Sequence, residues 1–452
     1  MTIPGPKGYP LLGVTPMMIK RGADFLLESF HAYGDVVALP LKRPATMYLL
    51  AHPDHVQQVL VKNSSKYVVV RPSAHYNTLM GNGLTVSNGD YWRRQRRILQ
   101  PAFQRRKTDV MSDIITARIA AVINDWEAGP DSQVEISHQM ERISLGVLLD
   151  TLLGTSLDDR QVRRLTSSVQ RVLTAAGKGM FLEIPPSWPT PENRRIKHAQ
   201  QEINHVIHEI ISQRRASGPR AEQDLLSLLL DARDETTGEA LNETELRDEI
   251  TANLVAGYET TACALDWCLH LVATHPQVEQ RLVTEIQTAL NGRRPTADDL
   301  AAMPYLGQVI NESMRLIPPF WAYTRVLLGE EECFNGHRIP PNSLIVLSPW
   351  VTHHHPQFWP DPERFDPERF APQNTAARHR FAYFPFGAGP RVCVGMGPAQ
   401  LTLQLAVAMI LQQYQLRPAP GRSPQARTAM TVHPKDGIMM RVRPRDEPAS
   451  HG

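Results

Sequence analysis

The chain of 452 residues has few cysteines, and their spacing excludes two common kinds of site. The four are Cys263, Cys268, Cys333 and Cys393, and no two of them form a Cys-x-x-Cys pair. Small disulfide-rich proteins need a regular cysteine framework, and structural zinc sites need closely spaced thiolates. We therefore expect neither kind of site, and we expect a reducing compartment.

Long apolar runs and an excess of one charge are also absent. No stretch reaches the roughly 18 apolar residues that span a bilayer, and residues 1–13 carry prolines instead of an apolar segment. The formal charge is +2, from 48 basic and 46 acidic residues, which indicates no nucleic-acid partner. We expect a cytoplasmic protein without a transmembrane anchor.

Linkers and internal repeats are missing as well. The length would allow about three average domains, yet no low-complexity segment divides the chain. We therefore expect a single domain over residues 1–452, which begins with a Pro/Gly-rich entry at 1–22 and ends with a flexible tail at 446–452.

The apolar pattern predicts a mainly α-helical protein with a small β-region. Apolar residues recur at helical spacing over much of the chain, as at Ile115, Ile119 and Ile123. Helices are predicted near residues 23–32, 53–61 and 91–97, within 108–173, up to about 215, and over 243–270. Strands are predicted at 36–41, 47–50, 335–339 and 344–347 and in a hairpin at 428–442, and loops at 64–90 and 175–193.

Residues 384–400 place a cysteine where a loop becomes a helix. Gly387 and Gly389 allow a tight turn, and the helix N-terminus that follows favours a thiolate at Cys393. Gly395 leaves room for a flat group close to the backbone. A free cysteine is usually a small buried hydrophobe, so only the surroundings of Cys393 favour a metal ligand.

These surroundings resemble the haem-binding signature of the cytochromes P450, the haem-thiolate monooxygenases. The matching stretch reads Phe386-Gly387-x-Gly389-x-Arg391-x-Cys393-x-Gly395. The resemblance implies a cytochrome P450 fold, with haem b held between the long central helix and this loop. It implies that Cys393 is the axial ligand, that Phe386 packs beside its sulfur, and that Arg391 pairs with a propionate. Thiolate ligation pushes electron density into the iron and favours cleavage of the O–O bond.

A basic helix carries a second match to the family. Trp92 and Arg96 lie at i and i+4, and a solvated face with one buried aromatic would be the ordinary interpretation. The family has a Trp-x-x-x-Arg pair here that binds haem propionates, and Arg325 matches a further propionate partner. The neighbouring Arg93 and Arg94 fit either a solvated face or a docking patch for an acidic redox partner.

The helix predicted at 243–270 has small residues in its middle, in the sequence Ala256-Gly257-Tyr258-Glu259-Thr260-Thr261. Glycine inside a helix costs roughly 1 kcal/mol relative to alanine, so a ligand or a closely crossing helix must explain Gly257. The Thr260 hydroxyl can face that groove or bond back to a carbonyl. The stretch resembles the family's acid–alcohol pair, which implies that Ala256 and Gly257 approach the haem. It also implies that Thr260 donates a hydrogen bond to dioxygen and that Glu259 relays protons.

Glu312 and Arg315 form another helical pair, which in most proteins is a surface ion pair worth at most about 1 kcal/mol. The family locks such a pair to an arginine further along the chain, here Arg369, so the resemblance implies a structural triad. Three consecutive histidines, at 353–355, cannot easily converge on one metal ion, and we expect them to be structural.

The resemblance runs in family order along nearly the whole chain and implies the oxidation of an apolar small molecule by O₂. A terpenoid, a fatty acid or a polyketide would suit, in a pocket lined by Thr85, Ala256, Phe320 and Ala322. We expect a monomer that receives electrons from a ferredoxin and its reductase or from a flavodoxin. Two alternatives stay open: a peroxygenase of the same fold, which would generally lack the acid–alcohol pair, and a haem sensor or carrier, which would normally need an output domain.

Overall fold

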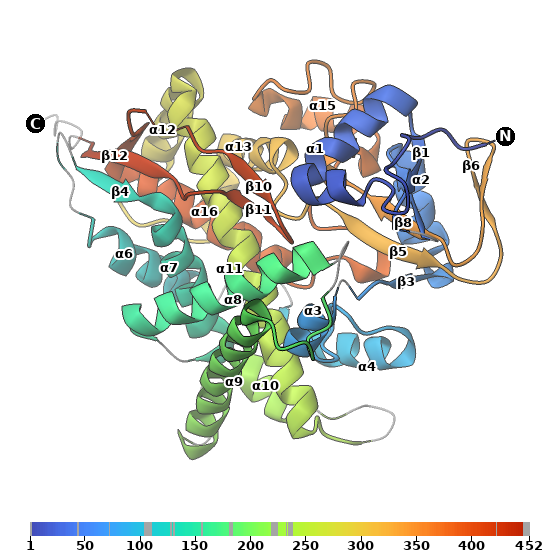
Figure 1. Ribbon diagram of the computed structural model, residues 1–452. Helices are drawn as coiled ribbons and strands as arrows, with labels where there is room; N and C mark the ends of the chain where they lie inside the picture. The colour runs from blue at the N-terminus through green and yellow to red at the C-terminus, as the bar shows by residue number, and fades with distance from the viewer. Residues whose placement is uncertain are drawn as a thin grey trace, which may run out of the picture.

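A helical part and a β-rich part lie side by side in the molecule (Figure 1). The computed structural model describes residues 2–42, 45–71, 73–103, 111–126, 129, 132–154, 157–179, 184–217, 225–231, 233, 238–421 and 423–445. The helices are α1 (Thr15–Tyr33), α2 (Pro53–Gln57), α3 (Ala74–Met80), α4 (Gly89–Leu99), α6 (Ser112–Ile123), α7 (Ile136–Leu148), α8 (Asp159–Gly179), α9 (Pro191–Ser217), α10 (Leu225–Asp231), α11 (Glu243–Thr274), α12 (Pro276–Leu290), α13 (Pro304–Leu316), α14 (Pro349–Thr352), α15 (Pro372–Ala377) and α16 (Met396–Gln413).

The strands form small sheets. They are β1 (Val36–Pro40), β2 (Thr46–Leu50), β3 (Tyr67–Val69), β4 (Gln133–Glu135), β5 (Tyr323–Leu327), β6 (Glu332–Phe334), β7 (His337–Ile339), β8 (Leu344–Leu347), β9 (Tyr414–Pro418), β10 (Ala426–Thr428), β11 (Val432–Pro434) and β12 (Met439–Pro444). A five-stranded sheet has the order β1-β2-β8-β5-β3, and a three-stranded sheet has the order β4-β12-β9. The remaining strands form the hairpins β6-β7 and β10-β11.

The long helix α11 crosses the helical part and contacts helices on several sides, among them α3, α7, α12, α13 and α16. A capping box starts it: the Asn242 side chain accepts from the Glu245 N–H, and the Glu245 side chain accepts from the Asn242 N–H. The 32 residues of α11 are buried on most faces, which explains why its sequence lacks a simple amphipathic stripe.

Two apolar cores meet along α11. Its first half packs with α3, α7, α8 and α9, and its second half packs with α6, α7, α12, α13 and α16. A third cluster joins α1 to the five-stranded sheet. Residues 256–260 lie where the first two cores meet, so the acid–alcohol stretch is held from both sides.

Most predicted elements are confirmed, and the differences have local causes. Residues 64–90 contain β3 and α3, which are too short to produce a sustained period. Helix α8 runs to Gly179 and therefore takes the first residues of the loop predicted at 175–193. The prediction that residues 428–442 form one hairpin is wrong. Strand β10 pairs with β11 in a shorter hairpin, whereas β12 pairs with β9 and β4.

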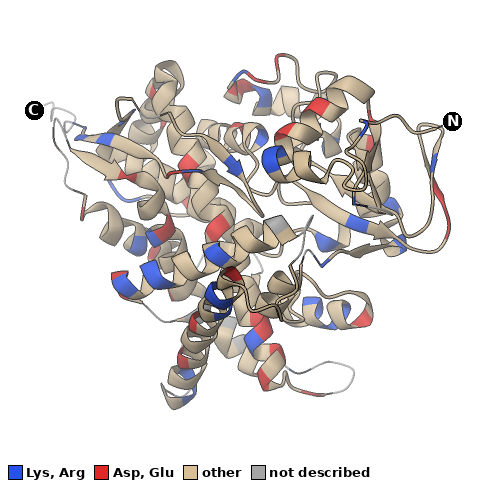
Figure 2. Cartoon of the chain, in the orientation of Figure 1, with Lys and Arg blue, Asp and Glu red and all other residues tan. Residues whose placement is uncertain are grey.

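Charged residues of both signs are interspersed over the helices, as the near-balanced composition suggests (Figure 2). None of the helices in the described ranges is long and apolar enough to cross a membrane. The predicted tail at 446–452 lies outside the described residues.

Candidate active site

The loop before α16 is shaped by two glycines with positive φ angles, +72° at Gly387 and +68° at Gly389. A Cβ atom on Gly389 would lie 1.9 Å from the carbonyl oxygen of Leu60, so no larger residue fits there. The Gly387 N–H donates to the Phe384 carbonyl at 2.9 Å, and the Cys393 N–H donates to the Phe386 carbonyl at 3.0 Å. These bonds fold the loop back on itself and fix Phe386 next to Cys393.

Cys393 precedes Gly395, the N-cap of α16, so it lies just before the helix and not in its first turn. Its thiol is accessible although protein surrounds it, and burial raises its pKa. The N–H of Gly395 and the guanidinium of Arg96 oppose that rise. The expected preference for a free thiolate is therefore wrong for this thiol, and a bound metal ion would have to deprotonate it. The atom nearest to a Cβ on Gly395 would be the Cys393 sulfur at 3.9 Å, which leaves the predicted room for a flat group.

Arg96, Arg325 and Arg391 gather beside this loop. Arg96 donates to the Val392 carbonyl at 2.8 Å, and Arg391 donates to the Ser87 carbonyl at 2.8 Å. Burial lowers the pKa of Arg325 to about 10. Burial, followed by the charges of Arg325 and Arg96, lowers the pKa of Arg391 to about 10. The surroundings of Arg325 and Arg391 therefore disfavour the charged form of their guanidinium groups.

Within the described part of the chain, none of these arginines forms an ion pair with a carboxylate. Trp92 contributes a face to the cluster, because the guanidinium carbon of Arg391 lies 4.2 Å from the centroid of its ring. Buried guanidinium groups normally have acidic partners. A planar group that carries two carboxylates would supply them, so the residues present fit haem propionates.

One face of α11 is left accessible in an otherwise buried helix. Ala256 is exposed, and Asn253, Gly257 and Thr260 are half-buried. Their spacing of three and four residues puts them on one stripe. The Thr260 hydroxyl bonds back to the Ala256 carbonyl at 2.7 Å, the second of its two predicted orientations.

Helix packing explains the glycine at 257. A Cβ atom there would lie 2.3 Å from Cδ1 of Leu148, so α7 and α11 cross closely at this point. The predicted cofactor contact of Gly257 therefore has no support in its packing. Ala256 is exposed on the accessible stripe, so its contact with the cofactor stays a prediction.

Glu259 points away from this stripe and is 7% exposed. One carboxylate oxygen accepts a hydrogen bond from the Thr431 hydroxyl at 3.0 Å. Burial raises the pKa of Glu259 to about 7, although the bond from Thr431 works against the rise. The carboxyl group is thus poised to gain and lose a proton near neutral pH.

The loop that carries Thr85 is anchored to the start of α11. The Asp248 carboxylate accepts the N–H of Asn82 at 2.6 Å, and the Glu249 carboxylate accepts the N–H of Leu84 at 3.2 Å. Thr85 itself is exposed, as a pocket position requires.

The two other predicted pocket residues separate in the structure. Phe320 is half-buried and packs against the core of α3, α8, α9 and α11. Ala322 packs against the cluster of α1 and the five-stranded sheet instead. The segment between them is irregular, so residues two apart need not share a side. Phe320 thus lies against the core that contains the first half of α11, whereas Ala322 does not, and the pocket roles of both stay predictions.

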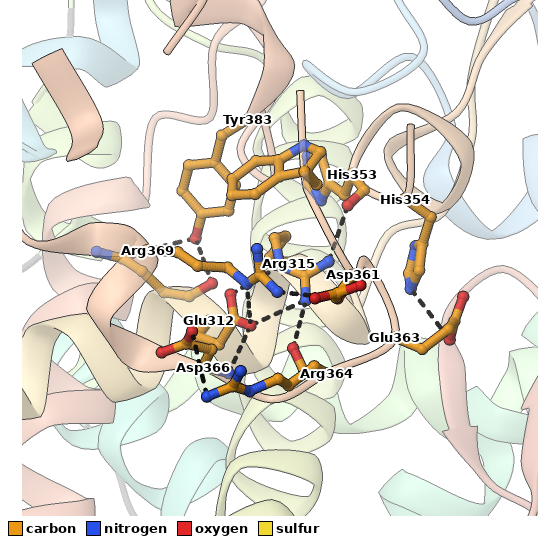
Figure 3. A network of polar contacts seen from close by, with 12 residues as sticks. Glu312, Arg315, His353, His354, Asp361, Glu363, Arg364, Asp366, Arg369 and Tyr383 are labelled. Atoms are coloured by element: carbon orange, nitrogen blue, oxygen red, sulfur yellow. Dashed lines mark hydrogen bonds and ion pairs between the residues drawn. The ribbon is translucent and has the colours of Figure 1, made fainter. Parts of the chain in front are cut away.

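Figure 3 shows the predicted triad assembled. Arg315 donates to both carboxylate oxygens of Glu312, at 2.7 and 2.9 Å, and both side chains are fully buried. Arg369 lies 3.4 Å from the same carboxylate. Arg315 also donates to the His353 carbonyl at 2.9 Å. This network joins α13 to the segment that leads to the cysteine loop.

The three histidines are structural, as predicted. His353 accepts from the Phe384 N–H at 3.0 Å, and His354 and His355 meet the Trp350 carbonyl and Asp35. No cluster of metal-ligating side chains was found among the described residues.

Sequence reasoning missed Tyr323 and Thr431. The Tyr323 hydroxyl donates to the Pro385 carbonyl at 2.9 Å and so braces the cysteine loop. Both residues act through contacts with partners far away in the chain, and no local pattern marks either of them. Asp248 and Glu249 offered a weak signal, because an acidic pair inside a largely buried helix needs partners.

A cysteine that precedes a helix, beside arginines without an acidic partner among the described residues, fits a haem-thiolate protein. The comparison with known families agrees: the chain belongs to the cytochrome P450 family, whose sequence pattern matches residues 3–442. Members of this family bind haem b, and the chain is an oxidoreductase of the P450 monooxygenase class.

Named relatives extend the comparison. A cyclooctat-9-en-7-ol 5-monooxygenase of Streptomyces melanosporofaciens is 37% identical over 418 residues, 92% of this chain and 90% of the relative. A pentalenene oxygenase of Streptomyces avermitilis is 31% identical over 446 residues, 97% of each chain. The structure of retinoic acid bound cyanobacterial CYP120A1 superposes with a TM-score of 0.86 at 28% identity, over 98% of this chain and 99% of that one.

Proposed function

We propose that this P450 hydroxylates or epoxidises a cyclic terpenoid. Two relatives that match more than nine-tenths of this chain are named for oxidising cyclooctat-9-en-7-ol and pentalenene, both cyclic and largely apolar. Two of the residues predicted to line the pocket, Phe320 and Ala256, are also apolar. Among terpenoid, fatty acyl and polyketide substrates, these observations favour the first.

Each site residue has a role in this proposal. The haem, when bound, supplies the activation of O₂. Cys393 holds the iron, and Arg96, Arg325 and Arg391, with Trp92, bind the propionates and so fix the orientation of the ring. Thr260 offers a hydroxyl on the accessible stripe of α11, and Glu259 holds a proton behind it.

The arginine cluster is the observation that carries the assignment of a haem site. Positive side chains that lack acidic partners in the described chain would repel one another without a bound dianion. Replacement of Arg391 by Gln should therefore lower haem retention while the apoprotein melts at or above the wild-type temperature. Equal loss of haem-free and haem-bound stability would contradict a propionate role.

The substrate proposal is tested by binding spectra. Titration with cyclic terpene hydrocarbons and alcohols should shift the Soret band from low-spin to high-spin, whereas matched fatty acids and macrolides should not. The thiolate is tested in parallel, because Cys393→His should abolish the red-shifted Soret band of the ferrous carbonyl complex. A spin shift with fatty acids alone would overturn the terpenoid assignment.

A peroxygenase is the second candidate, and Glu259 and Thr260 argue against it, because that chemistry needs no proton relay for O₂. We expect little product from peroxide alone. Product should form with O₂ and electrons from a ferredoxin and its reductase, or from a flavodoxin. Efficient turnover with peroxide and none with reduced ferredoxin or flavodoxin would favour the peroxygenase over the monooxygenase.

A further inference from the structure

Residues 429–432, which are the turn between β10 and β11 and the first residue of β11, contact the central helix α11. The Trp267 indole N–H of α11 donates to the Val432 carbonyl at 2.9 Å. The Trp321 indole N–H donates to the Ala429 carbonyl at 2.8 Å, and the Val432 N–H donates to the Pro319 carbonyl at 3.0 Å. We call this segment the 429–432 turn. One bond from α11 and two bonds with the segment 319–321 therefore set the position of this turn.

At the middle of this turn, Thr431 meets the relay acid. Thr431 is 3% exposed, and its hydroxyl donates to a Glu259 oxygen at 3.0 Å. Cys263, one helical turn along α11, lies near the same hydroxyl. Among the described residues, further titratable groups that act on Glu259 or feel its charge are Glu141 of α7, Tyr76 of α3 and the neighbouring Tyr258 of α11. Burial and Glu141 favour the protonated carboxyl, and Thr431 is the described partner that favours the ionised one.

This partner is unusual because it carries no charge. A buried carboxylate is normally paired with a cation, which would keep it ionised at all pH values near neutrality. A hydroxyl stabilises the anion more weakly, and so the carboxyl group can change its protonation state near pH 7. A proton relay needs a group with this property.

Glu259 and Thr260 also point in different directions. Consecutive residues on a helix are about 100° apart, so a carboxyl group held at Thr431 is turned away from the accessible stripe. We propose that Thr431 is the positioning residue of the relay acid: its hydroxyl holds Glu259 against the 429–432 turn between proton transfers. The inference rests on the monooxygenase function proposed above.

The proton balance of this cycle is simple. The protonated Glu259 carboxyl gives its proton to a water molecule or to the Thr260 hydroxyl on the stripe, and that group passes its own proton on into the site, so that it stays neutral. The resulting carboxylate returns to the Thr431 hydroxyl and takes up one proton from solvent. No bond other than O–H forms or breaks, and Thr431 donates the same hydrogen bond before and after.

Three variants separate positioning from structure. Thr431→Val removes the hydroxyl at nearly constant shape, and Thr431→Ser restores it. Thr428→Val makes the same change on the same hairpin, where the side chain packs against Gly22 of α1. Glu259→Gln removes the titrating group and identifies its signal.

The first measurement needs no turnover. Infrared difference spectra of the haem-loaded protein should contain a carboxylic acid band that titrates and that disappears in Glu259→Gln. Loss of a hydrogen bond to the anion should raise the titration midpoint by about one pH unit in Thr431→Val. Thr431→Ser and Thr428→Val should keep the wild-type midpoint.

The second measurement is the pH profile of coupling, the ratio of product to electrons consumed. Coupling should fall as pH rises through the Glu259 midpoint, and in Thr431→Val that fall should move to higher pH by the same amount. An unshifted infrared midpoint in Thr431→Val, with or without a lower melting temperature, overturns the positioning role. A shifted midpoint with no oxidation of any substrate supports the hold on Glu259 and overturns the proposed function instead.

Discussion

At the scale of single residues, the neighbours Thr260 and Thr261 on α11 have different environments, so their substitution should have different effects. Thr260 lies on the accessible stripe, whereas Thr261 is 8% exposed and bonds back to the Gly257 carbonyl at 2.9 Å. Both hydroxyls make the same kind of helical bond. Only position distinguishes them, so the pair is a matched test of function against structure.

Thr260→Ala should keep haem and substrate binding but divert electrons from product to peroxide. The reason is that the site loses an oriented hydroxyl where a proton must be delivered. Peroxide release and product should be measured against consumed reducing equivalents. Thr261→Ala should stay coupled and lose only stability, and full coupling in Thr260→Ala would remove Thr260 from the mechanism.

Gly257 should be intolerant of even one methyl group. A Cβ atom would lie 2.3 Å from Leu148 Cδ1, and such overpacking typically costs about 1 to 3 kcal/mol. Gly307 of α13 has no atom within 4 Å of its Cβ position and provides the control. Chemical denaturation should show a destabilised Gly257→Ala and a Gly307→Ala that is neutral or stabilised by up to about 1 kcal/mol. Equal behaviour of the two would contradict the close helix crossing.

At the scale of elements, the Glu312–Arg315–Arg369 network holds α13 to the segment before the cysteine loop. Glu312 and Arg315 are fully buried, so a neutral residue at 312 leaves a buried guanidinium without its counter-charge. Glu312→Gln should cost about 3 to 5 kcal/mol and reduce haem content. Glu368→Gln, which breaks the exposed pair with Arg281, should cost less than about 1 kcal/mol. Similar melting temperatures for both variants would contradict the structural role.

Elements specified by local sequence could be predicted, and those defined by distant partners could not. The predicted β1-β2 hairpin and the predicted helix α11 are confirmed. The features that define them, a short connection and a capping box, lie in the local sequence. The predicted place of β12 in the 428–442 hairpin is wrong, because its partners β9 and β4 are not its neighbours in sequence. The Thr431–Glu259 bond spans 172 residues, so nothing near either residue could indicate it.

At the scale of the whole molecule, buried titratable groups of two kinds should make the free energy of unfolding depend on pH in opposite senses. Burial lowers the pKa of His354 to about 4 and also lowers those of His353 and His55. Burial raises the pKa of Glu249 to about 8 and that of Glu259 to about 7. Both kinds are neutral in the folded protein and charged in the unfolded chain over part of the range between pH 4 and 8.

The two limbs have opposite signs. Below about pH 6.5 the unfolded histidines bind protons that the folded ones cannot, so stability falls with falling pH. Above about pH 4.5 the unfolded carboxyls release protons that the folded ones keep until about pH 7 to 8, so stability falls with rising pH. Each group contributes up to about 1.4 kcal/mol per pH unit within its window.

Single substitutions should flatten one limb each. His354→Gln should reduce the loss of stability between about pH 6.5 and 4, because residue 354 then no longer titrates in the unfolded chain. Glu249→Gln should reduce the loss between about pH 4.5 and 8 for the same reason, and its amide keeps an oxygen for the Leu84 N–H. Urea unfolding of the haem-loaded protein across this range measures both slopes. The two windows overlap between about pH 4.5 and 6.5, so the carboxyl limb is read above that overlap. If His354→Gln changed the slope above about pH 6.5, or if neither variant changed any slope, these groups would not be the source of the pH dependence.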